Sequence, residues 1–169
     1  MKKILIIGAG AMGAAFSIPL IENRHHVTLS EPHNIKLISK LNLKKKFHPS
    51  LKINLPKKIK TKKFVPEMLN LQWDLIVVAV SSVGIEIISK YLAHLKSKTP
   101  ILVLTKGLKL NKTKKIITMS EQLNKNNKKL NISVLKGPCL AKELARKIKS
   151  YTVIAVSYTH LTLPTTPYV

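Results

Sequence analysis

Three glycines follow the first apolar run of the chain and are spaced as Gly8, Gly10 and Gly13. In such a pattern the first glycine permits a tight turn after a strand, the second lets the backbone approach a pyrophosphate, and the third lets the next helix pack closely on the strand. The N–H groups and the positive dipole end of that helix then face the phosphates. The pattern therefore predicts a dinucleotide-binding turn, although the glycine spacing alone is weak evidence.

An acidic residue stands at the distance from this turn that a dinucleotide site requires. Glu31 lies 23 positions after Gly8 and ends a second apolar run, residues 27–31. At the end of a second strand, a carboxylate is placed to bind the ribose 2′-OH of the adenosine. Because a carboxylate repels a 2′-phosphate, Glu31 favours NAD over NADP. The alternative for Glu31 is an ordinary solvated acid at a strand end.

Two further polar segments follow apolar runs, and in open α/β sheets ligands lie at the carboxyl ends of the strands. In segment 105–108, Lys106 is placed to hold a carbonyl oxygen or a phosphate by charge, although many lysines of this chain are simply exposed. In segment 136–143, Gly137 allows close backbone approach, and Cys139 is expected to cap the next helix and offer a donor. A catalytic thiol is disfavoured because no histidine is local to Cys139, so a small, half-buried thiol is the alternative.

The elements that must position these residues alternate along the chain. The predicted strands are 3–7, 27–31, 59–62, 75–80, 100–105, 132–135 and 151–156. The predicted helices are 11–23, 34–43, 83–95, 112–124 and 140–148, with a basic loop at 44–58. Pro19 is expected to kink the first helix. Aliphatic strands alternating with helices predict an α/β fold of the Rossmann type, a doubly wound and mainly parallel sheet covered on both faces.

The composition sets limits on partners and location. The formal net charge of +23 suggests nucleic acid or an anionic membrane. The lysines are nevertheless spread over most predicted loops and helix faces, and aromatic residues for base stacking make up only 5%. We therefore expect no nucleic-acid partner. The single cysteine excludes an internal disulfide, which fits a reducing cytoplasm.

The uncharged run 4–21 has the outline of a signal peptide, but its patterned glycines are better explained by a strand and turn, and no membrane span is expected. No Cys/His spacing predicts a metal site.

The end of the chain differs in composition from the rest, because residues 150–169 contain no Asp, Glu, Lys or Arg. The segment 157–169 resembles a translated sequencing-library adapter, so we expect one dinucleotide-binding domain at 1–156 followed by a non-native tail.

Four segments together resemble the N-terminal domain of bacterial-type NAD(P)-dependent glycerol-3-phosphate dehydrogenase. They are residues 6–13, 75–80, 104–108 and 137–145, and the loop 47–49 followed by 55–56 is a further match. The resemblance implies that Ala11 and Met12 contact the cofactor phosphates. It implies that Ser82 and Ala141 lie beside the cofactor, that Lys106 meets both nicotinamide and substrate, and that Gly137 and Cys139 touch the substrate.

This chain departs from the family pattern at three positions that lie in or next to these segments. The family usually has an aromatic residue at Met12, a hydroxyl residue at Cys139 and a proline at Ser81. A thiol is a weaker donor than a hydroxyl, so substrate affinity is affected more than the fold.

The resemblance also implies a reaction that this chain does not complete. The family transfers hydride between NAD(P)H and dihydroxyacetone phosphate, giving sn-glycerol 3-phosphate for phospholipids, in a cytoplasmic enzyme expected to be a homodimer. Its general-base lysine comes from a second, helical domain that is absent here, so no catalytic residue is assigned. The chain alone is expected to bind cofactor weakly or not at all and not to turn over. The alternatives are another two-domain dehydrogenase, such as a ketopantoate reductase, or a basic nucleic-acid-binding module with salt-dependent binding.

Overall fold

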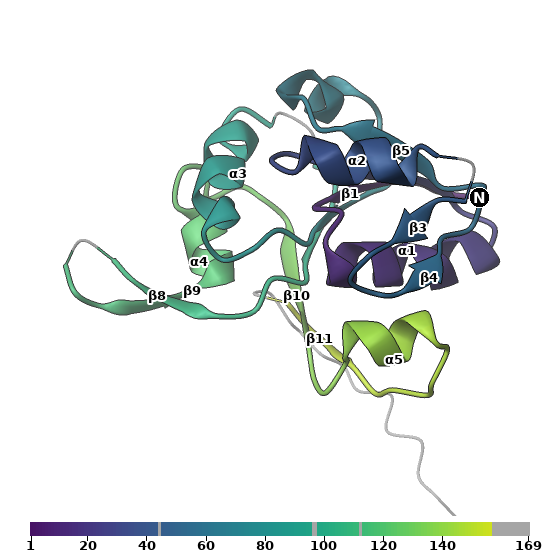
Figure 1. The fold of residues 1–169 in the computed structure, drawn as a ribbon. Helices are drawn as coiled ribbons and strands as arrows, with labels where there is room; N and C mark the ends of the chain where they lie inside the picture. The colour runs from purple at the N-terminus through teal and green to yellow at the C-terminus, as the bar shows by residue number, and fades with distance from the viewer. Residues whose placement is uncertain (44, 96–97, 112, 157–169) are drawn as a thin grey trace, which may run out of the picture.

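A seven-stranded sheet forms the middle layer of the fold (Figure 1). The structure, a computed structural model, describes residues 1–43, 45–95, 98–111 and 113–156. In spatial order the strands are β11 (Val153–Val156), β10 (Ile132–Lys136), β7 (Ile101–Val103), β6 (Leu75–Val78), β1 (Lys3–Ile7), β2 (His26–Glu31) and β5 (Lys60–Lys63). Neighbouring strands are parallel except β10 and β11. The order reverses beside β1, which confirms the Rossmann-type prediction.

Helices and two small hairpins surround this sheet. The helices are α1 (Ala11–Glu22), α2 (Ile35–Leu41), the 3-10 helix η1 (Pro66–Asn70), α3 (Gly84–Leu92), α4 (Met119–Asn124) and α5 (Ala141–Ala145). The hairpins pair β3 (Phe47–His48) with β4 (Ile53–Asn54) and β8 (Leu108–Leu110) with β9 (Ile116–Thr118).

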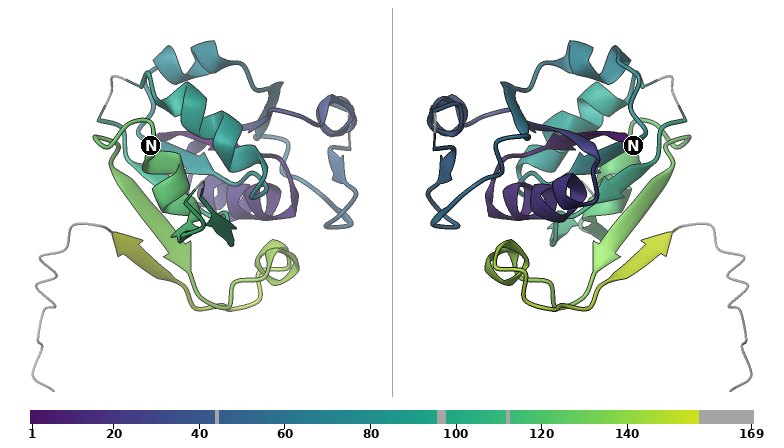
Figure 2. Two further views of the ribbon diagram at one scale, coloured as in Figure 1. Left: turned by 90° about the vertical axis from the view of Figure 1, so that its left-hand side faces the viewer. Right: turned by 90° about the vertical axis from the view of Figure 1, so that its right-hand side faces the viewer.

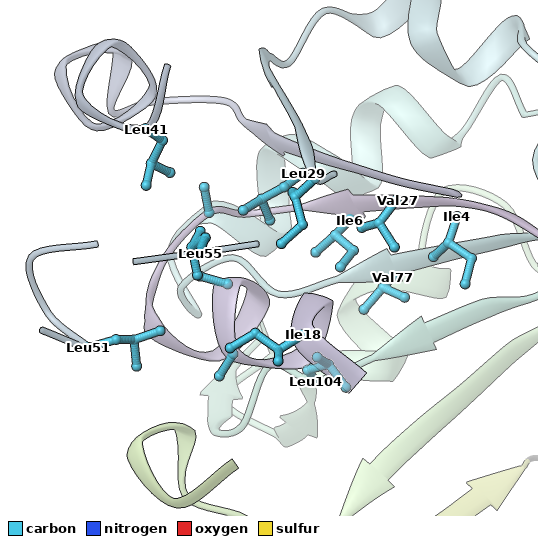
Figure 3. Close-up of a cluster of buried hydrophobic side chains, with 14 of the residues drawn as sticks. Ile4, Ile6, Ile18, Val27, Leu29, Leu41, Leu51, Leu55, Val77 and Leu104 are labelled. Carbon is cyan, nitrogen blue, oxygen red and sulfur yellow. The ribbon is translucent and has the colours of Figure 1, made fainter. Parts of the chain in front are cut away.

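Alternation along the central strands sends side chains to two separate cores. Ile4 and Ile6 of β1 face one core, where they meet Ile18 of α1 and residues of α2 and the β3–β4 loop (Figure 3). Leu5 and Ile7 face the other core, which is closed by α3, α4 and η1. Since both faces of the sheet are buried at its centre, residues 4–7 of β1 and all residues of β6 and β7 are aliphatic.

Several local predictions were wrong. The helix predicted at 112–124 begins only at Met119, because the residues before it form the β8–β9 hairpin. The side chain of Asn111 accepts the N–H groups of Thr113 and Lys115, and Lys114 has a positive φ of 58°, so side-chain-to-backbone bonds make a turn there. Residue 112 itself lies outside the described residues. The loop predicted at 44–58 contains the short β3–β4 hairpin, and η1 was not predicted.

Helix α1 continues through Pro19 to Glu22 without a break. Proline removes one intrahelical donor, and it stands here in the last turn of the helix. The hydrogen bond from the N–H of Asn23 to the Pro19 carbonyl completes the helix end.

The elements β8, β11 and α5 are much less covered than the centre of the fold. All residues of β8 and β11 are exposed, and α5 has no buried residue. Figure 1 shows the β8–β9 hairpin projecting from the body, and Figures 1 and 2 show α5 and β11 below the rest of the fold. Among the described residues, no helix combines the length and the apolar character needed to cross a membrane.

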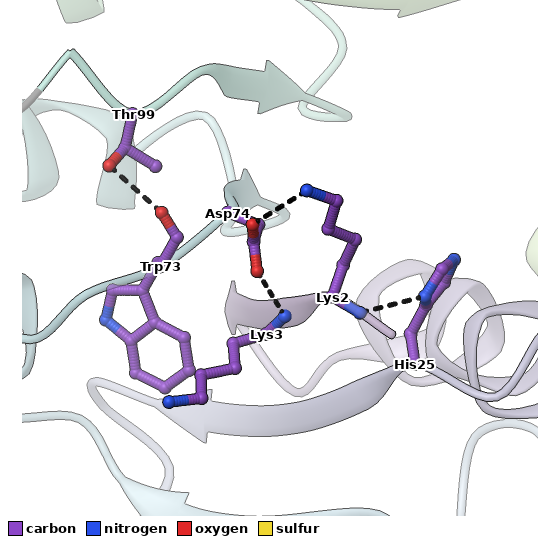
Figure 4. A network of polar contacts seen from close by, with 6 residues as sticks. All are labelled: Lys2, Lys3, His25, Trp73, Asp74 and Thr99. Carbon is purple, nitrogen blue, oxygen red and sulfur yellow. Dashed lines mark hydrogen bonds and ion pairs between the residues drawn. The ribbon is translucent and has the colours of Figure 1, made fainter.

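The amino ends of the strands form one edge of the sheet, held by a polar network (Figure 4). The Asp74 carboxylate accepts the N–H of Lys3 at 2.7 Å and lies 3.1 Å from the Lys2 ammonium. A shallow cavity of about 700 Å³ opens beside Trp73 and Asp74 at this edge. Ligands of open α/β sheets lie at the opposite, carboxyl edge, so the size of this cavity does not make it the functional site.

Candidate functional site

The glycine turn connects the end of β1 to the start of α1. Gly8 has a φ of +110°, and a Cβ there would lie 2.6 Å from the Ala79 carbonyl group. A Cβ on Gly13 would lie 2.0 Å from the Gly8 carbonyl oxygen, whereas one on Gly10 would meet no atom within 4 Å. Gly8 and Gly13 are thus required by close packing, while Gly10 borders open space at the N-terminus of α1.

Two buried polar side chains hold the residue between the first two glycines. Ala9 is fully buried, and its N–H donates to the Glu31 carboxylate at 2.8 Å. The other carboxylate oxygen accepts the N–H groups of His33 and Asn34 at 3.0 and 3.2 Å. The Ala9 carbonyl oxygen lies 2.9 Å from Nε2 of His48. The prediction that Glu31 ends β2 beside the turn is confirmed, and its carboxylate is occupied by backbone donors rather than solvated.

His48 was missed by sequence reasoning. It belongs to β3 and is 1% exposed, although a histidine in a basic loop is typical of an exposed residue. The only signal in the sequence was its place in the matching segment 47–49, which says nothing about burial.

A cavity of about 380 Å³ opens at the carboxyl ends of β6, β7 and β10. It brings together residues from four distant parts of the chain, namely Met12, Ser82, Lys106, Cys139 and Ala141. These are five of the predicted site residues. Ala11 precedes Met12 at the start of α1, and Gly10 precedes Ala11. The six other predicted residues lie outside the lining of this cavity, and they are Gly8, Gly10, Ala11, Gly13, Glu31 and Gly137.

Lys106 is the only charged residue in that lining, so the cavity attracts anions. Its ammonium donates to the carbonyl oxygen of Gly137 at 3.1 Å, which joins two predicted substrate-binding residues. The preceding Thr105 is anchored because its hydroxyl donates to the Val80 carbonyl at 2.7 Å. The strand-end backbone thereby holds the lysine at the mouth of the cavity while its charged end stays exposed.

Cys139 does not cap α5, contrary to expectation. Leu140 is the N-cap residue and makes no side-chain capping bond, because the helix begins one residue later than a Cys139 cap requires. The thiol is buried and lies 3.9 Å from the Ser150 hydroxyl, which donates to it. Among the described residues that line the cavity there is no histidine or carboxylate to act as a base for a nucleophilic thiol.

Within the part of the chain that the structure describes, no three His, Cys, Asp or Glu residues gather as a metal site would require.

Helix α3 and the β8–β9 hairpin are joined by an ion pair between Glu86 and Lys109, whose carboxylate oxygen and ammonium nitrogen lie 2.6 Å apart. The Lys109 ammonium holds the pKa of the Glu86 carboxyl below its ordinary value.

Comparison with known proteins decides the family. The model of the NAD-dependent glycerol-3-phosphate dehydrogenase N-terminus matches residues 3–162. The chain belongs to this family. The match excludes the ketopantoate reductase alternative and confirms the resemblance found in the motifs. It extends six residues past Val156, and the prediction of a non-native tail at 157–169 lies outside the described residues.

The relatives show how much of the family protein is present. The chain is 31% identical over 159 residues to a glycerol-3-phosphate dehydrogenase [NAD(P)+] of Bacillus pumilus and 29% identical to one of Photorhabdus laumondii. In each case 93% of this chain is covered but only 45% of the relative, so the chain spans about half their length. A solved glycerol-3-phosphate dehydrogenase of Coxiella burnetii shares the fold, with a TM-score of 0.74 at 21% identity over 93% of this chain and 47% of that one.

Proposed function

We propose that this chain is the cofactor-binding half of an enzyme that transfers hydride between NAD(P)H and dihydroxyacetone phosphate, giving sn-glycerol 3-phosphate. The observation that carries the proposal is the cavity at the carboxyl edge, where Met12, Lys106 and Cys139 meet next to the glycine turn. Family membership supports the same reaction.

The positions of the predicted site residues support the following proposed roles. The open side of Gly10 and the first N–H groups of α1, at Ala11, Met12 and Gly13, receive the pyrophosphate. Ser82 and Ala141 line the path of the cofactor. Lys106 would contact the nicotinamide and an oxygen of the phosphorylated substrate, and Gly137 and Cys139 would border the substrate. The nicotinamide supplies the hydride, and the protein binds and orients the partners.

Glu31 supports a preference for NAD over NADP within this proposal. Its buried carboxylate is held at the end of β2, and a negative charge there opposes a 2′-phosphate. Replacing it with serine removes that charge, so the ratio of NADPH to NADH affinity is expected to rise by about tenfold or more. Fluorescence titration with the two reduced cofactors measures the ratio, and an unchanged ratio contradicts the role.

The general-base lysine is proposed to lie outside residues 1–156. The whole enzyme is proposed to be a cytoplasmic homodimer, as the resemblance implies. The single cysteine, without a disulfide partner, supports the compartment.

A chimera tests the proposal. Residues 1–156 are joined to the C-terminal half of the Bacillus pumilus relative, and NADH oxidation is followed with dihydroxyacetone phosphate. We expect turnover by the chimera and none by the 169-residue chain. In the chimera, Lys106→Met is expected to lower kcat/KM by about a hundredfold or more, because it removes a charge-assisted contact to the substrate. Lys109→Met, which lies outside the cavity, is the matched control. Turnover by the 169-residue chain alone, or equal activity of the two variants, contradicts the proposal.

A further inference from the structure

We propose that His48 is a positioning residue for the cofactor site, which it serves by holding the peptide group between Ala9 and Gly10. This inference rests on the proposed cofactor-binding function. His48 contacts neither the cavity nor the open side of the turn, and it acts through the backbone.

The hydrogen bonds of His48 indicate which ring nitrogen carries the proton. Nδ1 of His48 accepts the N–H of Leu51 at 3.3 Å, so it carries no proton. The proton of the neutral ring is therefore on Nε2, which donates to the Ala9 carbonyl oxygen at 2.9 Å. Both ring nitrogens therefore have hydrogen-bond partners, and the side chain is buried.

Because the peptide bond is planar, the contact of His48 with the Ala9 carbonyl also orients an N–H group at the proposed phosphate-binding surface. The described residues contain no cis peptide bond. In a trans peptide the C=O and the N–H point in opposite directions, so fixing the Ala9 carbonyl also fixes the direction of the Gly10 N–H. That N–H points away from His48, on a residue where a Cβ would meet no atom within 4 Å.

Glu31 holds the neighbouring peptide in the same way. Its carboxylate accepts the Ala9 N–H, so the Gly8 carbonyl on the opposite side of that peptide points away from Glu31. The Gly8 carbonyl is indeed the group that approaches Gly13 of α1. Two side chains from distant segments thus fix both peptide planes of Ala9, and His48 controls the one next to the open side of the turn.

Two amide substitutions separate this role from general stabilisation. His48→Gln places an N–H donor at the position of Nε2 and loses the acceptor for Leu51. His48→Asn places its polar group at the position of Nδ1 and loses the donor to Ala9. Each variant removes one hydrogen bond of the ring, so a merely structural role predicts similar effects. His94→Asn, on an exposed histidine at the amino edge, is the control.

The experiment measures the amide signals of residues 8–13 by NMR in the 169-residue chain, and NADH affinity by fluorescence in the chimera that carries the C-terminal half of the Bacillus pumilus relative. We expect the change of the Gly10 amide signal to be at least about threefold larger for His48→Asn than for His48→Gln, because only His48→Asn loses the donor to the Ala9 carbonyl oxygen. We expect His48→Asn to weaken NADH binding by the chimera about five- to tenfold and His48→Gln to stay within about threefold of the parent chimera. Equal effects of the two variants on the Gly10 signal and on affinity overturn the inference. If the difference in the Gly10 signal appears but the parent chimera shows no NADH binding at millimolar concentration, His48 still fixes the turn and it is the proposed cofactor function that fails.

Discussion

The first β-α-β unit and the peripheral elements β8, β11 and α5 are built differently. In β1 and β2, eleven residues include nine that are buried, and their side chains fill two cores. In β8, β11 and α5 no residue is buried. Free energy of folding is concentrated where apolar side chains leave water, so we expect the first unit to contribute more to stability than β8, β11 and α5 do.

The same contrast separates the two halves of the candidate site. The glycine turn is fixed by Gly8, Gly13 and the bonds of Ala9 to Glu31 and His48. The side of the cavity formed by Cys139, Leu140 and Ala141 is attached to an exposed helix of five residues. We therefore expect a rigid phosphate-binding side and a more mobile substrate side.

The largest effect is expected from truncating the buried core of the first unit. Leu29 of β2 is fully buried, so Leu29→Ala is expected to cost about 2–5 kcal/mol by removing apolar contacts and leaving a cavity. Urea denaturation measures the loss. A change below about 1 kcal/mol contradicts the assignment of stability to this unit.

The next effect concerns the close approach of α1 to the turn. Gly13→Ala places a Cβ 2.0 Å from the Gly8 carbonyl oxygen, so α1 must move, and we expect a loss of about 1–3 kcal/mol. Gly10→Ala is the matched control, because its Cβ meets open space, and it is expected to change stability by less than about 1 kcal/mol. Thermal denaturation of the two variants tests the difference, and equal losses contradict the geometry of the turn.

A much smaller effect on stability is expected from substitutions in β8 and β11. Leu108→Ser and Val153→Thr change side chains that are 66% and 65% exposed, so each is expected to alter the free energy of unfolding by no more than about 0.5 kcal/mol. The same urea experiment applies. A loss as large as that of Leu29→Ala would show that these strands are part of the stabilising core.

The smallest effect is expected at the amino edge and depends on pH. The N–H of Lys3 and the Lys2 ammonium hold the pKa of Asp74 below its ordinary value. The carboxylate therefore adds stability above about pH 4, and that contribution is lost as the pH falls through the lowered pKa. Asp74→Asn is expected to lower Tm at neutral pH and to reduce its fall between about pH 4 and pH 2. Part of the fall remains, because Glu86 and Glu121 also have lowered pKa values. If Asp74→Asn leaves the fall of Tm between about pH 4 and pH 2 unchanged, the result contradicts the role of this contact.

The fold and half of the site were predictable because their signals are local. The aliphatic runs of β1, β6 and β7 identify buried parallel strands, and the glycine spacing identifies the turn. The hairpin at 108–118 was missed because its turn depends on side-chain-to-backbone bonds of Asn111, which compete with a helical pattern.

Other features depend on tertiary contacts that leave no local pattern. His48 is 39 residues from Ala9 in the sequence, and nothing in its neighbours indicates that its ring is buried against the turn. The position of Cys139 also depends on packing, since the start of α5 is shifted by one residue from the predicted cap.

The most direct test of the account is an NMR titration of the 15N-labelled chain with NAD⁺ up to millimolar concentration, which detects weak binding. The account predicts shifts of the amide signals of Gly10, Ala11, Met12, Ser82 and Lys106 at the carboxyl edge, with Trp73 and Asp74 at the amino edge unchanged. Shifts confined to the amino edge, or shifts of the glycine turn without shifts of Ser82 and Lys106, would contradict the claim that the glycine turn and the Lys106 cavity form one cofactor site.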